Sequence, residues 1–175
     1  MGSADREVFL RRLEKQLESV DSQRELVELV AAELRNTLGY RTTWLGVYSA
    51  ATGEYRVLAA ELAGGDDLWD SSEPIPIDGD PYVSRLIESN TPQVIDDAQV
   101  SDEVNREIVE QLGNRTVINV PIVLDGERFG SIGTGTFGDE GPRPPSEEDL
   151  TYLSRLGEIA GAALSRSLRH AGHID

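Results

Sequence analysis

Few side chains in this sequence can take part in covalent or metal-based chemistry. Cysteine is absent, and the two histidines, His170 and His173, lie close together near residue 175. The absence of cysteine excludes disulfides, thiolate zinc sites, cysteine nucleophiles and thioether-linked chromophores. Two histidines in one short segment also make a histidine-based catalytic site or metal cage unexpected. We therefore look for function among carboxylates, amides, hydroxyls and aromatic rings.

Two groups of acidic residues are candidates for binding. Asp96 and Asp97 follow a short apolar segment, where a carboxylate could accept hydrogen bonds from a ligand amine or ring N–H, with Asn105 nearby. The alternative is a solvated acidic surface before a helix capped by Ser101. The other group lacks the spacing of an EF-hand loop, so we expect no specific calcium site there. Its members are Asp66, Asp67, Asp70, Asp78 and Asp80.

Aromatic rings and amides supply further candidate contacts. Trp44 and Tyr48 alternate along one face of a predicted strand, where they either line a pocket or pack in the core. Trp69 lies in an acidic loop, where it either covers a pocket or anchors the loop to the sheet. Asn119 interrupts an apolar strand, so its amide needs partners, either in a pocket or at the backbone near Pro121.

The glycine-rich segment 130–136 has only a superficial likeness to a phosphate-binding loop. It lies inside a predicted strand and does not open a helix, which is the context that such loops require. Small residues here are expected to allow close packing or to leave room for a pocket. Thr134 is therefore a further pocket candidate.

Helical periodicity predicts which elements surround these residues. Apolar spacing predicts long helices over about 9–20, 22–38 and 147–168, and short helices over about 81–89 and 101–112. The second long helix begins with the capping box Ser22 to Glu25 and ends at Gly39. The last begins at Ser146.

Alternating and apolar segments predict the strands. Residues 42–48 and 55–60 form one predicted hairpin, and 116–124 and 127–137 form another across the turn dipeptide Asp125-Gly126. Residues 92–95 form a short strand, and 62–79 are predicted as loop. Helices and an antiparallel-rich sheet in this order predict one α+β domain.

The net charge of the chain limits the classes of molecule that it can bind. The chain of 175 residues has 32 acidic and 16 basic residues, a net charge of −16 and a pI near 4.4. This field repels phosphate backbones, so we expect no direct nucleic-acid binding. The only lysine is Lys15, a composition typical of either a salt-adapted organism or a GC-rich genome. Apolar runs are too short to span a membrane, and the polar first residues lack a signal core, so we expect a cytoplasmic protein.

Three stretches of the sequence resemble GAF domains, the small-molecule sensory modules of cyclic-nucleotide phosphodiesterases, phytochromes and many signalling kinases. They are the first hairpin, 44–59, then residues 84–97, and finally 116–133 together with 146–150. The last contains the most specific motif, VPI followed by DG and FG. The resemblance covers about residues 24–166.

The resemblance implies a three-layer α+β fold related to PAS domains. A central antiparallel sheet of about six strands would have the terminal helices on one face and small helices and loops on the other. The implied organisation is an N-terminal helix over 1–21 for linking or dimerisation, one GAF domain over 22–170, and a tail over 171–175. The pocket candidates are Trp44, Tyr48, Trp69, Asp96, Asp97, Asn105, Asn119 and Thr134.

The sequence departs from three functional subsets of the family. The cyclic-nucleotide-binding subset carries an Asn-Lys-Phe-Asp-Glu signature, whereas the corresponding region, 137–149, has no lysine and no matching phenylalanine. Cyclic nucleotides are therefore not expected as ligands. The bilin-binding subset attaches its pigment through cysteine, and the free-methionine-sulfoxide reductases of the family use cysteines for chemistry. Both activities are excluded for this chain.

We therefore expect a non-enzymatic sensory domain that needs no cofactor or metal and binds an unidentified small molecule. The apolar stripes of 6–20 and 147–168 must pack on each other or on a second chain, and we expect a homodimer through these helices. A fused histidine kinase or regulator output domain is a further expectation. The alternative is a ligand-free structural dimerisation module. A cavity of about 300 Å³ or more with converging polar groups favours sensing.

Overall fold

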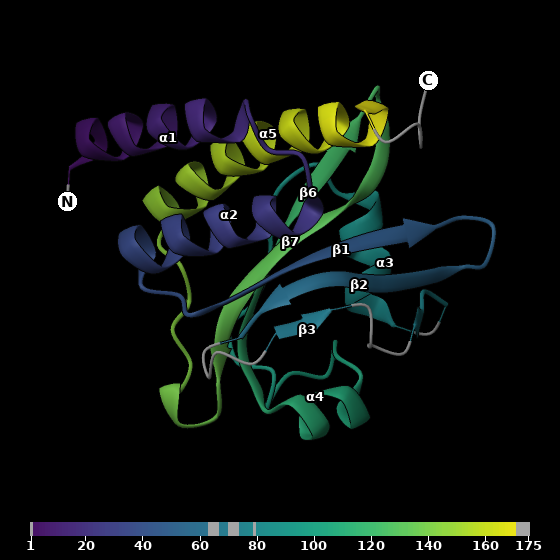
Figure 1. Cartoon of the computed structure of the whole chain (residues 1–175). Coiled ribbons are helices and arrows are strands. Elements are labelled where there is room, and N and C mark those ends of the chain that lie inside the picture. Colours follow the sequence, from purple (N-terminus) through teal and green to yellow (C-terminus); the bar gives the residue numbers. More distant parts are fainter. Residues whose placement is uncertain (1, 63–66, 70–73, 79, 171–175) are drawn as a thin grey trace.

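A single antiparallel sheet separates three long helices from two short ones (Figure 1). The computed structural model describes residues 2–62, 67–69, 74–78 and 80–170. The strands follow the order β3-β2-β1-β7-β6-β5, and β4 pairs additionally with β2. Their bounds are β1 Thr42–Ser49, β2 Glu54–Glu61, β3 Asp67–Trp69, β4 Ile75–Pro76, β5 Gln93–Ile95, β6 Asn114–Leu124 and β7 Glu127–Phe137. The expected antiparallel sheet of about six strands is confirmed.

Three long helices cover one face of the sheet, and two short ones lie on the other side (Figure 1). The long helices are α1 Ser3–Leu17, α2 Gln23–Leu38 and α5 Glu147–His170, and the short ones are α3 Pro81–Glu88 and α4 Arg106–Leu112. This arrangement confirms the three-layer α+β fold. No helix among the described residues is long and apolar enough to cross a membrane.

Side-chain caps begin two of the long helices where the sequence predicts. Ser22 Oγ accepts from the Glu25 N–H at 3.1 Å, and Ser146 Oγ accepts from the Asp149 N–H at 3.1 Å. The Asp149 carboxylate returns the bond to the Ser146 N–H at 3.0 Å, which completes a capping box. Gly39 ends α2 with a φ of 76°, a left-handed conformation that suits glycine.

Helix α4 begins five residues later than the sequence predicts. The expected cap, Ser101, instead accepts from the Glu103 N–H at 3.2 Å, and the cap of α4 is Asn105. Arg106 explains the difference, because its guanidinium donates to the carbonyls of residues 98, 99 and 101. These bonds hold 98–101 in a turn and prevent an earlier helix start. The predicted loop over 62–79 also contains the short strands β3 and β4.

The core of the protein lies between the sheet and the three long helices. Inward-facing sheet residues pack against α2 and α5, and the apolar stripe of α1 packs against these two helices, so the stripes at both ends of the chain are buried within one chain. The sheet contributes Leu45, Ile118, Val120, Ile122 and Ile132, and the helices contribute Leu10, Leu13, Leu17, Leu26, Val27, Val30, Leu34, Leu153, Leu156 and Leu164.

Two glycines bring α5 unusually close to the sheet. A Cβ atom at Gly157 would overlap Val120 Cγ1 of β6, and one at Gly161 would lie 3.3 Å from Ile122 Cγ2. These positions are one helical turn apart, so they form a smooth strip along α5. The strip allows β6 to contact the helix backbone closely.

Candidate functional site

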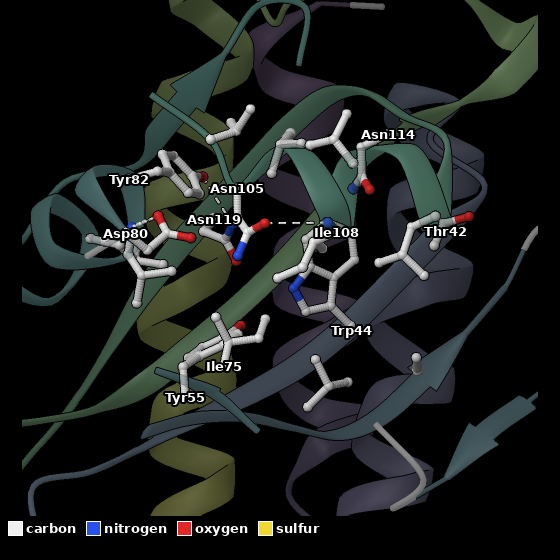
Figure 2. A pocket seen from close by; sticks show the side chains of 18 of the residues that line it. Thr42, Trp44, Tyr55, Ile75, Asp80, Tyr82, Asn105, Ile108, Asn114 and Asn119 are labelled. Carbon is white, nitrogen blue, oxygen red and sulfur yellow. Dashed lines mark hydrogen bonds between the residues drawn. The ribbon is translucent and has the colours of Figure 1, made fainter. Parts of the chain in front are cut away.

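The face of the sheet opposite the long helices holds a cavity of about 430 Å³ (Figure 2). Strands β1, β2, β6 and β7 contribute to one side of it, and α3, α4 and neighbouring segments contribute to the other. Its apolar lining is Trp44, Val57, Ala60, Leu62, Ile75, Val83, Leu86, Val104, Ile108, Val109, Leu112, Val117 and Phe137. Its polar lining is Thr42, Tyr55, Asp80, Tyr82, Asn105, Asn114 and Asn119.

The indole of Trp44 packs over a glycine on the neighbouring strand, which leaves room for the ring. Trp44 pairs with Gly133 across β1 and β7, and a Cβ atom at Gly133 would overlap the indole ring. Phe137 packs edge-on against the indole, with the ring centres 6.3 Å apart and the planes at 80°. The two rings therefore form one aromatic wall of the cavity. The glycine-rich segment thus makes room for a ring.

A continuous chain of hydrogen bonds crosses the sheet face below the cavity. Tyr55 Oη donates to Ser131 Oγ at 3.1 Å, and Ser131 Oγ donates to Asn119 Oδ1 at 3.0 Å. Asn119 Nδ2 donates to Tyr82 Oη at 2.9 Å, and Tyr82 Oη donates to the Gln93 carbonyl at 3.2 Å. The donor directions follow because each hydroxyl has only one hydrogen.

Burial keeps the two phenols of this chain in their donor form. Desolvation raises the pKa of both Tyr55 and Tyr82 above the ordinary value near 10. Both therefore stay protonated at physiological pH and continue to donate. Because Asn119 is only 4% exposed, this network also satisfies an amide that would otherwise be costly to bury.

Two polar side chains at the ends of the cavity keep unused hydrogen-bonding capacity. Asp80 is 7% exposed, and its Oδ1 caps α3 by accepting from the Val83 N–H at 3.0 Å. Asn114 is 8% exposed, and its Oδ1 has no hydrogen-bond partner within the described residues. Figure 2 shows these two residues at opposite ends of the cavity.

Three arginines that adjoin lining residues in the chain are bound to protein partners, although the buried Nε of Arg85 has no partner of its own within the described residues. Arg85 pairs with Glu103 at 2.7 Å and stacks over the Tyr82 ring. Arg106 binds backbone carbonyls, and Arg115 binds Asp97 through two hydrogen bonds of 3.0 and 2.8 Å. No arginine, lysine or histidine lines the cavity among the described residues. Asp80 is the only charged lining residue there.

The structure brings three of the predicted site residues together. Trp44, Asn105 and Asn119 all line the cavity, from β1, the start of α4 and β6 respectively. Asn105 also caps α4, because its Oδ1 accepts from the N–H groups of Glu107 at 3.0 Å and Ile108 at 3.4 Å.

Other predicted site residues lie outside the cavity lining. The Tyr48 ring packs against Tyr55, with the ring centres 5.4 Å apart. The Asp97 carboxylate is held by Arg115, whose hydrogen bonds lower the pKa of Asp97. The backbone carbonyl of the neighbouring Asp96 accepts a hydrogen bond of 2.7 Å from Thr116 Oγ1.

Thr134 lies on the opposite face of the sheet. It follows Ile132 at an interval of two residues, and Ile132 belongs to the helical core. Its hydroxyl donates to the Thr42 carbonyl at 2.7 Å. The backbone of Trp69 pairs with Ala59, whereas its side chain lies outside the described residues. Asp66 and Asp70 also lie outside them.

Sequence reasoning missed five polar lining residues, which are Thr42, Tyr55, Asp80, Tyr82 and Asn114. Asp80 caps α3 directly before Pro81, and Asn114 directly follows Gly113, which ends α4, so both residues have a local role. A polar residue with such a local role gives no separate sequence signal for a cavity. Within the described residues, no group of three or more histidine or acidic side chains could hold a metal ion.

The sequence matches the GAF domain family over residues 20–165. This chain belongs to the GAF domain family. The match covers most of the chain, including every strand and the two short helices beside the cavity. No curated protein matches the sequence.

Solved structures, GAF domains among them, share the fold at low sequence identity. The GAF domain of a phosphoenolpyruvate-protein phosphotransferase from Coxiella burnetii has a TM-score of 0.74 and 17% identity, covering 99% of this chain and 100% of that one. The phycocyanobilin-bound GAF domain of a cyanobacterial phytochrome has a TM-score of 0.68 and 19% identity, covering 96% and 98%. Free methionine-R-sulfoxide reductase from Neisseria meningitidis has a TM-score of 0.67 and 16% identity, covering 98% and 96%.

Proposed function

We propose that this GAF domain is a sensory module that binds a small molecule in its cavity. The observation that carries the proposal is an apolar cavity of about 430 Å³ with polar groups at its floor and ends. This volume lies within the usual range of small-molecule sites, roughly 300–1,000 Å³. A purely structural module would be expected to fill this space with side chains, as the helical side does.

Strand β6 offers a route from the cavity to the long helices. Asn119 lines the cavity, whereas its neighbours Ile118 and Val120 face the helical core. A ligand that moves Asn119 would therefore change the surface on which α5 packs. Signalling requires that the ligand bind two helix arrangements with different affinities.

The proposed role is binding without catalysis. The chain contains no cysteine, so it cannot perform the cysteine chemistry of the family's reductases. Among the described residues of the cavity lining, no histidine, lysine or serine accompanies Asp80 to make a nucleophile and base pair. The polar groups present are suited to recognition by hydrogen bonding.

We further propose that the domain acts as a cytoplasmic homodimer, attached to or acting on a kinase or regulator. The stripes of α1 and α5 pack within one chain, so a dimer would use their outer faces, where Val8 is 61% exposed. Light scattering at tens of micromolar tests the dimer. A monomeric mass in both low and molar salt would contradict it.

Native mass spectrometry and thermal shift of the purified chain test ligand binding. We expect either a co-purifying small molecule or a compound that raises the melting temperature in proportion to its concentration. The screen covers nucleosides, purines, amino acids, amines and 2-oxo acids, at low and high salt.

Two variants in which an alanine is replaced by leucine test where the ligand binds. Ala60→Leu fills part of the cavity and should weaken binding, whereas Ala162→Leu on the exposed side of α5 should not. An absence of any ligand across the screen would contradict the sensory role. Equal binding by both variants would place the ligand elsewhere.

A further inference from the structure

We infer that the cavity takes an uncharged or cationic ring-containing molecule with a carboxamide or lactam edge, and that it rejects anions. This inference rests on the proposed function and names the ligand class of the same site. Three observations carry it: the charge of the lining, the unpartnered amide of Asn114, and the aromatic wall made by Trp44 and Phe137.

The charge of the lining excludes an anionic ligand. Asp80 is buried and is the only charged residue among the described residues of the lining. Arg85 and Arg115, on neighbouring elements, are each paired with a carboxylate. A buried phosphate or carboxylate would have no cation to compensate its desolvation. The net charge of −16 adds a long-range repulsion.

Asn114 supplies the specific feature of the ligand. Its carboxamide has an acceptor and a donor side by side, and its Oδ1 is buried without a hydrogen-bond partner. Leaving such an atom unpaired destabilises the free protein. The hydroxyls of Thr43 and Tyr48 are also unpaired among the described residues, but neither residue lines the cavity, whereas Asn114 does. Its position therefore points to a partner that arrives with the ligand. A carboxamide or lactam edge offers the complementary donor and acceptor.

The aromatic wall and the far end of the cavity define the rest of the molecule. Trp44 and Phe137 line the cavity together with Asn114, and Asn114 pairs with Phe137 across β6 and β7. A ligand whose amide reaches Asn114 therefore places its adjoining ring near two aromatic side chains. At the opposite end, Asp80 favours a hydrogen-bond donor or an ammonium group.

Three probes with one ring system separate these effects. Indole-3-acetamide carries a neutral amide, tryptamine carries a cation, and indole-3-acetate carries an anion of nearly the same shape. We expect the amide and the amine to bind at millimolar concentration or below in ligand-observed NMR. Indole-3-acetate should bind at least about tenfold more weakly, because it has no cationic partner.

Two asparagine variants test the role of Asn114 directly. Asn114→Leu should weaken indole-3-acetamide binding about tenfold, because a hydrogen-bonded amide contact is lost. The same substitution should raise the melting temperature of the free protein by about 2–4 °C, because a buried unpaired acceptor disappears. Asn105→Leu is the matched control in the same cavity. It should lower the melting temperature, because Asn105 caps α4.

The outcomes separate this inference from the proposed function. Binding of the amide and amine over the acetate, with the two asparagine variants shifting stability in opposite directions, supports the inference. Preferential binding of indole-3-acetate in the cavity overturns the ligand class and leaves the sensory role standing. Failure of all three probes also overturns the ligand class. The sensory role falls only if the wider screen and native mass spectrometry find no ligand either. A lower melting temperature for Asn114→Leu overturns the role given to Asn114.

Discussion

On the helical side of the sheet, large side chains fill the space between strands and helices, whereas the other side encloses a cavity. Among the described residues, eleven of the twelve largest fully buried side chains belong to the helical core, and the remaining one, Leu86, lines the cavity. On the cavity side, Gly133 makes room for Trp44, and Gly46 makes room for Tyr55, because a Cβ atom at either glycine would overlap the facing ring.

The polar groups on the two sides differ in the same way. On the helical side, the buried carboxylate of Glu33 accepts from Tyr152 Oη at 2.6 Å and from Thr37 Oγ1 at 2.8 Å. On the cavity side, Asn114 keeps an acceptor without a partner. Within the described residues, Thr43 Oγ1 on the helical side also lacks a hydrogen-bond partner, but Thr43 is completely buried in the core, whereas Asn114 lines the cavity. The difference teaches that the helical side closes its polar groups off from other molecules. Under the proposed function, the cavity side leaves some of its polar groups within reach of a ligand.

The largest expected effect comes from a matched leucine pair. Leu156→Ala in α5 should lower the free energy of unfolding by about 2–5 kcal/mol, because it leaves a cavity in a fully buried core. Leu112→Ala at the cavity side should cost less than about 1 kcal/mol, because Leu112 is 50% exposed. Urea unfolding measures both. Equal losses would remove the contrast between the two sides.

Tyr152→Phe tests the buried polar contact of the helical side. The hydrogen bond from Tyr152 to the Glu33 carboxylate should make the loss about 1.5–3 kcal/mol at neutral pH, as for bonds to charged groups. Urea unfolding measures it, and Thr151→Ala on the exposed face of α5 is the control. A loss as small as that of the control would show that Glu33 is satisfied without Tyr152.

The same tyrosine predicts a stability change at alkaline pH. Burial and the hydrogen bond to Glu33 raise the pKa of Tyr152 above its ordinary value of 10.0, so the folded protein retains a proton that the unfolded chain loses. The contribution is present below pH 10 and declines as the pH rises above it. In Tyr152→Phe, the decline should be shallower by up to about 1.4 kcal/mol per pH unit. Identical pH slopes for the two proteins would contradict the shift.

Asn119→Ala tests the hydrogen-bonded chain of the cavity side. It removes the donor to Tyr82 and the acceptor for Ser131, so we expect a loss of about 1–3 kcal/mol in chemical unfolding. The double variant with Ser131→Ala should cost less than the sum of the two single variants, because both act on one network. Additive losses would indicate that the bonds act independently.

The smallest expected effect belongs to Asp97. Its hydrogen bonds from Arg115 lower its pKa, so the pair is present at neutral pH and is lost as the pH falls through that lowered value. Asp97→Asn should change the unfolding midpoint at pH 7 only slightly, because the pair is partly exposed and solvent screens it. It should also leave ligand affinity unchanged, because Asp97 does not line the cavity. Loss of ligand binding in this variant would show that Asp97 contributes to the binding site.

Strong local signals made much of the fold predictable. Asp125 and Gly126 have φ values of 51° and 83°, as the hairpin dipeptide predicts, and the caps at Ser22 and Ser146 are present. Such signals depend on a few neighbouring residues. The start of α4 was not predictable in this way, because it depends on Arg106 reaching carbonyls five to eight residues earlier in the chain.

The cavity was only partly predictable, because the face on which a strand residue lies depends on a single step of register. Trp44 and Asn119 are placed toward the cavity, whereas Thr134 shares the face of Ile132 and is buried under the helices. Asp80 and Asn114 carry ordinary capping and turn signals, which hide a second role. Their shared location depends on the tertiary packing of α3, β6 and β7.

The glycine strip of α5 has a mechanical consequence. At Gly157 and Gly161 no side chain of α5 separates its backbone from Val120 and Ile122 of β6, and Asn119 lies beside them on the opposite face. Packed interiors have low compressibility, so this direct contact between strand and helix backbone should be stiff. A small displacement of β6 from its cavity side would therefore shift the axis of α5 by a similar amount. Widening the strip with a single methyl group would change the stiffness of the joint and leave the cavity lining intact.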